Sequence, residues 1–163
     1  MTRAEAAQIL TDRDARLTAL LDRLTPTQLT AAATIGGGDW SAKDLLGHVA
    51  FWEELALAAL DGWRTGDLPA PREVDDLNAE NQARSAAQAL EVVRERAAGA
   101  HRRLLASIEA VSDADWEESR TIRERTFTLG QLLGGITAGP AGAFDHVDAH
   151  LADLSAYVES AGA

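Results

Sequence analysis

The sequence predicts an all-α protein, a four-helix bundle formed by a single domain over residues 1–163. Apolar residues recur with the spacing of one helix face in four segments, whereas alternating apolar and polar runs, which are typical of strands, are nearly missing. Glycine and proline are gathered at a few places, as expected between helices. A chain of 163 residues can bury a core without disulfide bonds or a structural metal. We therefore expect no sheet of three or more strands.

The first predicted helix spans about residues 3–24 and ends where Thr25 and Pro26 interrupt it. A short helical turn is expected over residues 28–33, before the run of glycines at 36–38. The apolar side of the first helix contains Ile9, Leu17, Leu20, Leu21 and Leu24. This side is expected to face the core.

The start of the second helix is the best-defined boundary in the sequence. Ser41 is expected to be its N-cap, and Asp44, three residues later, completes a capping-box pattern. A proline-containing loop over residues 66–71 is expected to follow the helix. The apolar residues that recur with helical spacing are Leu45, Val49, Trp52, Ala56, Ala59 and Trp63.

A third helix is predicted over about residues 73–111, with a break near residues 78–81. Residues 112–116 indicate a new N-cap and a single turn, and the polar stretch at 117–125 is expected to be a loop. The residues of the third helix that are expected to face inward are Val92, Val93, Ala97, Leu104 and Ile108.

The last predicted helix spans about residues 129–159 and is capped by Thr128. Pro140, which is flanked by glycines, is expected to kink this helix about one turn before His146 and His150. Four long helices joined by connections of mixed length are typical of a four-helix bundle.

The charge and composition exclude several classes of function. The formal net charge is -11, from 26 acidic against 15 basic residues, and such a surface repels nucleic acid and anionic membranes. The chain contains no cysteine, so it has no thiolate nucleophile of its own. No stretch approaches the length of apolar residues that a membrane span requires. We expect a cytoplasmic protein with no nucleic-acid or membrane partner.

Three of the four histidines are placed so that one metal ion can bind them all. His146 and His150 are four residues apart, so on a helix they project from neighbouring turns of one side. His48 and His150 face the predicted interior, and His146 lies at the border of the apolar face. Three imidazoles leave an ion with open coordination positions, as in catalytic sites. The alternative for each is a hydrogen-bonded core residue, and His101 is expected to be structural or exposed.

Three segments of the chain resemble motifs of a known family. Residues 40–53, Trp-Ser-Ala-Lys-Asp-Leu-Leu-Gly-His-Val-Ala-Phe-Trp-Glu, resemble the W-S-x-K-D-x-x-x-H-x-x-x-W motif of the DinB-like superfamily, and more narrowly of its ClbS/DfsB branch. Residues 145–151 are similar to the H-x-x-x-H motif that ends those proteins, and residues 74–79 resemble the acidic-Leu-Asn stretch of the branch. The motifs occur in the expected order over nearly the whole chain.

The resemblance implies a bundle that is commonly dimeric, so we expect a homodimer. It implies a metal site formed by His48, His146 and His150, which would hold zinc, nickel or another divalent ion. Relatives include thiol-dependent transferases and isomerases that use mycothiol, bacillithiol or glutathione, and proteins that open reactive natural products. Some members of the branch lack part of the histidine set, so the presence of all three favours a metal-using member.

Other residues are candidates for the substrate pocket. Trp52 lies one turn after His48 and is expected to form a wall of the metal site. Asn78 and Asn81 either cap a helix or orient a ligand, as the resemblance suggests for Asn78. Asp44 either completes the capping box or accepts the free ring N–H of His48. Asp145 and Asp148 flank the last two histidines, and we expect both to be solvated carboxylates.

Two functions remain open on the sequence alone. The first is a metal-dependent enzyme, a hydrolase or a thiol-dependent transferase or isomerase, that acts on a small electrophile in detoxification or self-resistance. Its divalent ion would lower the pKa of a water or of an incoming low-molecular-weight thiol. The alternative is a non-catalytic protein that binds a small molecule or acts in stress, with a structural or vestigial metal site. The substrate and the physiological metal are not specified by these motifs.

Overall fold

The computed structural model describes residues 1–36, 38–135 and 142–162, and the predicted helical bundle is confirmed with a small β-hairpin added. The elements within these residues are α1 (Arg3–Leu21), α2 (Pro26–Leu29), α3 (Ala42–Thr65), α4 (Val74–Ala87), α5 (Leu90–Glu109), α6 (Asp113–Glu117), β1 (Ser119–Ile122), β2 (Arg125–Thr128), α7 (Leu129–Gly134), α8 (Gly142–Asp145) and α9 (Asp148–Ala161). None of the helices in the described ranges is both long and apolar enough to cross a membrane.

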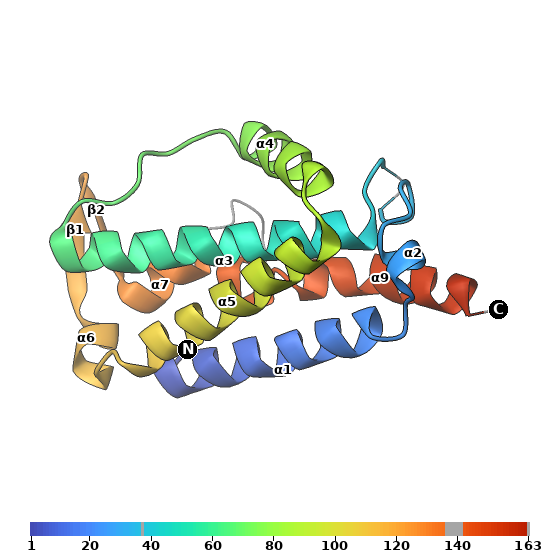
Figure 1. Ribbon diagram of the computed structural model, residues 1–163. Coiled ribbons are helices and arrows are strands. Elements are labelled where there is room, and N and C mark those ends of the chain that lie inside the picture. The colour runs from blue at the N-terminus through green and yellow to red at the C-terminus, as the bar shows by residue number, and fades with distance from the viewer. Residues whose placement is uncertain (37, 136–141, 163) are drawn as a thin grey trace.

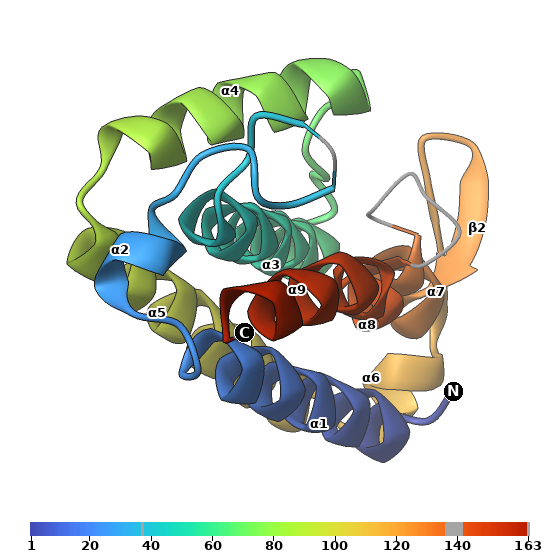
Figure 2. The same ribbon diagram turned by 90° about the vertical axis from the view of Figure 1, so that its right-hand side faces the viewer.

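Three long helices and one composite column form the bundle. Helices α1, α3 and α5 run along its length, and α7, α8 and α9 follow one another to form the fourth column (Figure 1). Helix α4 lies outside the bundle against α3, which is clear in the end view (Figure 2). Helix α3 therefore has neighbours on several sides, and its buried residues include His48 and Trp52.

The chain between the first two helices differs from the prediction. Helix α1 ends at Leu21, three residues before the predicted end, and α2 starts at Pro26 rather than at residue 28. Thr25 and Pro26 start a helix here. The Thr25 side chain accepts the N–H of Gln28, and proline occupies the first turn, where its missing N–H costs no hydrogen bond.

The beginning of α3 agrees with the sequence. Ser41 and Asp44 form the predicted capping box, and Gly66 ends the helix in the left-handed conformation, with φ of 80°. Gly47 lies where α3 meets α4 closely, because a Cβ at this position would be 2.1 Å from Ser85 Oγ. The missing side chain at Gly47 thus lets α4 pack beside His48.

The predicted third helix is two helices. The break lies between α4 and α5, at residues 88–89, and the predicted break at 78–81 is wrong because α4 continues through it. Lys43 Nζ donates to the carbonyl oxygens of Ala86 at 3.1 Å and Gln88 at 2.9 Å. These contacts satisfy carbonyl groups that the end of α4 leaves without helical partners. A residue far away in sequence therefore stabilises this break.

The stretch at 117–125 was predicted to be a loop, and part of it is a hairpin instead. Strands β1 and β2 are antiparallel, and Ser119 pairs with Thr128. Arg123 and Glu124 form the turn with φ of 51° and 65°. Such turns normally contain Asn or Gly, so this one lacks the usual sequence signal. The Arg123 guanidinium donates to Pro69 O at 3.0 Å, which ties the hairpin to the segment after α3.

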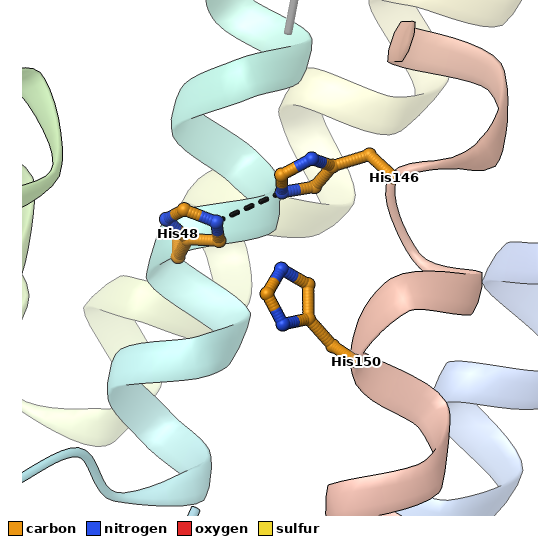
Figure 3. Close-up of side chains that lie close together, drawn as sticks. All are labelled: His48, His146 and His150. Carbon is orange, nitrogen blue, oxygen red and sulfur yellow. Dashed lines mark hydrogen bonds between the residues drawn. The ribbon is translucent and has the colours of Figure 1, made fainter. Parts of the chain in front are cut away.

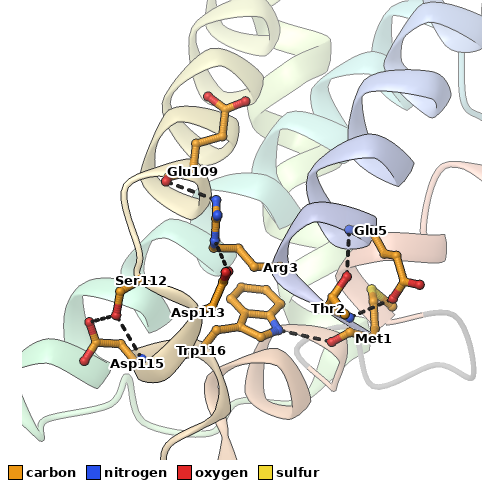
Figure 4. A network of polar contacts seen from close by, with 9 residues as sticks. All are labelled: Met1, Thr2, Arg3, Glu5, Glu109, Ser112, Asp113, Asp115 and Trp116. Atoms are coloured by element: carbon orange, nitrogen blue, oxygen red, sulfur yellow. Dashed lines mark hydrogen bonds and ion pairs between the residues drawn. The ribbon is translucent and has the colours of Figure 1, made fainter.

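The N-terminus is joined to the region around α6 by polar contacts (Figure 4). Arg3 Nε lies 2.9 Å from Asp113 Oδ1, and Arg3 Nη1 donates to Glu109 O at 3.2 Å. The indole of Trp116 donates to Met1 O at 3.1 Å. This network holds α1 against the C-terminal end of α5, at the end of the bundle away from the C-terminus.

The predicted last helix is divided among α7, α8 and α9. The predicted kink at Pro140 lies outside the described residues. Two apolar clusters form most of the core, one around Leu60, Trp63 and Leu133, the other around Leu45, Val49 and Leu154.

Candidate metal centre

His48, His146 and His150 converge from two sides of the bundle (Figure 3). Each ring offers one nitrogen, and the three nitrogens all lie within 4.8 Å of one another. The Nε2 atoms of His48 and His146 are 2.8 Å apart. His48 is buried, with 3% of its surface exposed, and the other two histidines are half-buried. This group can hold a metal ion.

The backbone around His146 differs from the predicted continuous helix. Helix α8 ends at Asp145 and α9 begins at Asp148, so His146 lies in the turn between them. The N–H of His150 donates to Val147 O at 2.9 Å in the first turn of α9. Because His146 is not part of α9, its ring direction is set by this turn and not by the helical spacing of four residues.

Ion pairs from α1 hold the turn that contains His146. Arg13 contacts both flanking carboxylates, Asp145 at 2.8 Å and Asp148 at 2.7 Å. Arg16 adds a contact to Asp148 at 3.0 Å. The two carboxylates are partly exposed, as expected, but they also fix the break between α8 and α9.

All three imidazoles are neutral near pH 7. Burial, followed by the neighbouring charges of His146 and His150, lowers the pKa of His48 to about 2. Burial and the charge of His150 lower the pKa of His146 to about 4. Burial also lowers the pKa of His150, against a smaller opposing effect of Asp153. Neutral imidazole is the form that binds a metal, so the site does not have to lose protons first.

The spacing of the rings is close to that of three ligands on one metal ion. Imidazole nitrogens bind zinc at about 2.0–2.1 Å, so two of them on one tetrahedral ion are about 3.3 Å apart. The Nε2 atoms of His48 and His146 are 2.8 Å apart and all three ligand nitrogens lie within 4.8 Å, so small side-chain rotations would bring them onto one ion. Imidazole ligands suit zinc and nickel among other divalent ions, and the donor set does not choose between them.

Aromatic rings surround the three histidines. The ring of Trp40 lies edge-on to His48 with centroids 4.8 Å apart. The Trp52 ring is 6.2 Å from that of His48 and 5.8 Å from that of His146. Trp52 Nε1 is buried and has no hydrogen-bond partner within the described part of the chain. Trp52 therefore lies beside the centre and forms one of its walls.

The two asparagines contribute differently. Asn81 is buried, and its Oδ1 accepts from Arg96 Nη1 at 3.3 Å. Arg96 also binds Glu54 through two hydrogen bonds of 3.0 and 2.8 Å, so this group joins α4, α5 and α3. Asn78 Oδ1 is buried without a partner in the described ranges. No hydrogen bond in those ranges joins either asparagine to the three histidines.

Within the described residues, the contacts of Asp44 are those of the capping role. Its Oδ2 accepts from the backbone N–H of Ser41 at 2.9 Å and from the Ser41 hydroxyl at 2.6 Å. Asp44 Oδ1 and His48 Nδ1 are both buried and lack partners among the described residues. The second option for Asp44, a hydrogen bond to the free ring N–H of His48, is therefore not formed.

Glu53 was not singled out from the sequence, yet it lies next to the centre. With Trp52 and His146 it lines a small cavity of about 10 Å³, which is enough for about one water molecule. His101 Nδ1 donates to Glu53 Oε1 at 2.9 Å, and His101 Nε2 lies 3.8 Å from Asp14 Oδ2. Burial raises the pKa of Glu53 more than its contact with His101 lowers it. The sequence feature that could have identified Glu53 is its position, because it is an acidic residue on the apolar face of α3.

Residues 3–138 match the family model of the DinB superfamily, which is most of the chain. The chain belongs to the DinB superfamily. His48 lies inside the matched residues of this DinB-superfamily chain, whereas His146 and His150 lie beyond them. No curated protein matches the chain.

Solved structures share the DinB fold at low sequence identity. An uncharacterised protein from Escherichia coli UTI89 is 14% identical with a TM-score of 0.79, over 99% of this chain and 95% of that one. The colibactin self-resistance protein ClbS, solved in complex with a double-stranded DNA, is 18% identical with a TM-score of 0.70, over 95% and 96%. A mycothiol-dependent maleylpyruvate isomerase is 14% identical with a TM-score of 0.62, over 100% of this chain and 62% of the isomerase. These likenesses show the shared fold.

Proposed function

We propose that this chain is a metal-dependent enzyme of the ClbS/DfsB branch, and that it acts on a small electrophilic molecule. The reaction is a hydrolysis, or a transfer or isomerisation that uses a low-molecular-weight thiol, in detoxification or self-resistance. The convergence of His48, His146 and His150 within 4.8 Å carries this proposal. The fold shared with a self-resistance protein and with a thiol-dependent isomerase supports it.

The three histidines would hold a divalent ion, zinc or nickel, as neutral ligands. Such an ion supplies Lewis-acid activation of a nucleophile at neutral pH. Because the chain contains no cysteine, a thiol nucleophile has to be brought by a second substrate. His48 anchors the ligand set on the rigid helix α3, and the turn held by Arg13 brings His146 to it.

Trp52 and Glu53 have separate roles in this proposal. Trp52 covers one side of the histidines and limits the access of bulk water. Glu53 lines the small cavity beside His146, and its raised pKa brings its proton exchange closer to neutral pH. A carboxylate with such a pKa is suited to accept a proton from a nucleophile and return it to a product. His101 holds the Glu53 carboxylate in position at 2.9 Å.

One observation favours the alternative function, a non-catalytic protein that binds a small molecule around a vestigial metal site. Metal-bound histidines nearly always donate their second ring N–H to an acceptor. His48 Nδ1 is buried and has no such partner in the described part of the chain. A site that no longer binds metal could keep the three histidines together without an acceptor for the second ring N–H of His48.

The test is metal content followed by turnover. Protein purified without a nickel affinity column is analysed by mass spectrometry for bound metal, and we expect about one divalent ion per chain. The metal-loaded protein is then incubated with epoxides, cyclopropanes and maleyl-type acceptors, with and without low-molecular-weight thiols. His48→Gln should lose both metal and turnover. His101→Gln, a histidine substitution outside the ligand set, is the matched control and should keep the metal.

The outcomes separate the two functions. Turnover that depends on both the metal and His48 supports the enzyme. Metal that is bound without turnover of any acceptor favours the binding protein. A chain that takes up no divalent ion when supplied with zinc or nickel would exclude the metal-dependent enzyme.

A further inference from the structure

A pocket of about 370 Å³ lies between α3, α4, β2, α7 and the segment that joins α3 to α4. In Figure 1 this segment and α4 pass over one side of α3. The volume is in the range of small-molecule sites, which is about 300–1,000 Å³. Most of the lining is apolar and includes Leu55, Leu77, Pro69 and Leu132. The pocket can therefore take the apolar body of a small ligand.

Trp52 is the wall that this pocket shares with the histidine cluster. Its side chain lines the pocket, and its ring centroid is 5.8 Å from that of His146 and 6.2 Å from that of His48. A molecule in the pocket would thus lie one ring away from the candidate metal centre. Trp52 is 4% exposed, so its ring is a fixed wall against which a flat ligand can pack.

The charges at the pocket are the opposite of those on the chain as a whole. The chain has a net charge of -11, yet the described residues that line this pocket include Arg72 and Arg125 and no acidic residue. A guanidinium binds a carboxylate through two parallel hydrogen bonds. The lining therefore combines an apolar floor with two cationic side chains that can attract an anionic group.

The two arginines are available to different degrees. The Arg125 side chain has no hydrogen bond or ion pair to any residue that the structure describes, whereas its backbone pairs with Ile122 in the hairpin. Arg72 contacts Glu80 of α4, but both side chains of this pair are about half exposed. An exposed ion pair contributes little, so a ligand carboxylate can compete for Arg72. Arg123 holds the hairpin to Pro69 and so keeps Arg125 beside the segment that lines the pocket.

We propose that this pocket binds an organic anion with a flat apolar body and a carboxylate, with the body against Trp52 and the carboxylate at Arg125 and Arg72. This inference rests on the proposed function, because it assigns the substrate class of the same centre. It adds a specificity: neutral molecules of equal shape bind less well than carboxylates.

The experiment compares two probes of nearly equal shape, trans-cinnamate and its neutral amide, cinnamamide. Binding to the metal-free full chain is measured by titration calorimetry. We expect cinnamate to bind about ten-fold or more tightly than cinnamamide, as a charged hydrogen bond predicts. Arg125→Gln should weaken cinnamate binding about ten-fold and leave cinnamamide unchanged, with a similar but smaller effect of Arg72→Gln. Arg23→Gln, an exposed arginine outside the pocket, is the matched control and should leave both affinities unchanged.

Three results would overturn this inference: equal affinities for the two probes, no saturable binding of cinnamate, or a preference for cinnamate that persists in both pocket variants. The assay needs no metal, so its failure is distinct from failure of the metal-dependent enzyme. A chain that binds cinnamate but takes up no divalent ion would keep the pocket and exclude the enzyme.

Discussion

The rings of His48 and His146 are 98 positions apart in the sequence, and their Nε2 atoms lie 2.8 Å from each other. Two neutral imidazoles can make this contact only if one Nε2 carries a hydrogen and the other does not. A divalent ion between them would remove that requirement, because each ring then presents a lone pair. Burial lowers the pKa of both rings and keeps them neutral, which is the form in which both could bind one ion.

Metal binding is expected to stabilise the folded chain. An ion that binds only the folded protein adds about 2.7 kcal/mol when its concentration is 100 times its Kd. Zinc added to the metal-free protein should therefore raise the melting temperature in a thermal shift experiment. The shift should disappear in His48→Gln and His146→Gln, since each removes a ligand, and should persist in His101→Gln. An equal shift in all of these variants would mean that zinc binds elsewhere.

The stability of the metal-free protein should fall as the pH drops below about 6.5. The pKa of His48 is about 2 in the folded chain, so an unfolded histidine takes up a proton that the folded one does not. The unfolded state then binds more protons, and the free energy of unfolding decreases with a slope that approaches about 1.4 kcal/mol per pH unit for this residue well below pH 6.5.

Urea unfolding of the metal-free protein at several values between pH 7 and pH 5.5 measures this slope. His48→Gln should make it shallower, because the substituted residue no longer titrates. Equal slopes in the two proteins would show that the burial of His48 does not govern this part of the pH dependence.

The features that could be predicted from the sequence are those with local causes. Ser41 and Asp44 are three residues apart, so their capping box is visible in the sequence. The helical spacing of α3 likewise places His48 and Trp52 toward the interior, and both are buried. The convergence of the three histidines followed from this periodicity together with the family resemblance.

The errors have causes that lie far away in the sequence. Lys43 satisfies the end of α4, and Arg13 holds the turn at His146, so neither break has a nearby signal. The hairpin was missed because Arg123 and Glu124 adopt positive φ, which these residue types rarely do. Pairing between α3 and α5 explains why Glu53 was overlooked, since its partner is 48 positions away.

Gly47→Ala should destabilise the protein, because the new Cβ would lie 2.1 Å from Ser85 Oγ and 2.8 Å from Ser85 Cβ. Overpacking of this kind costs about 1–3 kcal/mol, which urea unfolding can measure. Ser85→Gly in the same chain removes both atoms and should restore part of the loss. Gly99→Ala is the control, since only the tip of the Arg103 side chain is close, at 3.1 Å. If Gly47→Ala is as stable as the control, α4 does not pack this tightly against α3.

The last prediction concerns the pKa of His101. Burial lowers this pKa, but the hydrogen bond and charge of Glu53, with the charge of Asp14, outweigh burial and raise it above 6.5. A raised histidine pKa adds stability that is complete below the unfolded pKa and is lost as the pH rises through the folded pKa. Glu53→Gln removes the charge but keeps the shape, so burial then dominates and the pKa of His101 should fall below its ordinary value.

A pH titration of the His101 ring signals by NMR in wild-type protein and in Glu53→Gln measures this difference. Asp14→Asn should lower the pKa of His101 less than Glu53→Gln does, because the charge of Asp14 has the smallest effect on this pKa and lies 3.8 Å away. The stability of Glu53→Gln should also vary less with pH where His101 titrates in the wild type. If the pKa of His101 is the same in both proteins, Glu53 does not control its proton, and His101 cannot hold the Glu53 carboxylate in the way that the proposed proton transfer requires.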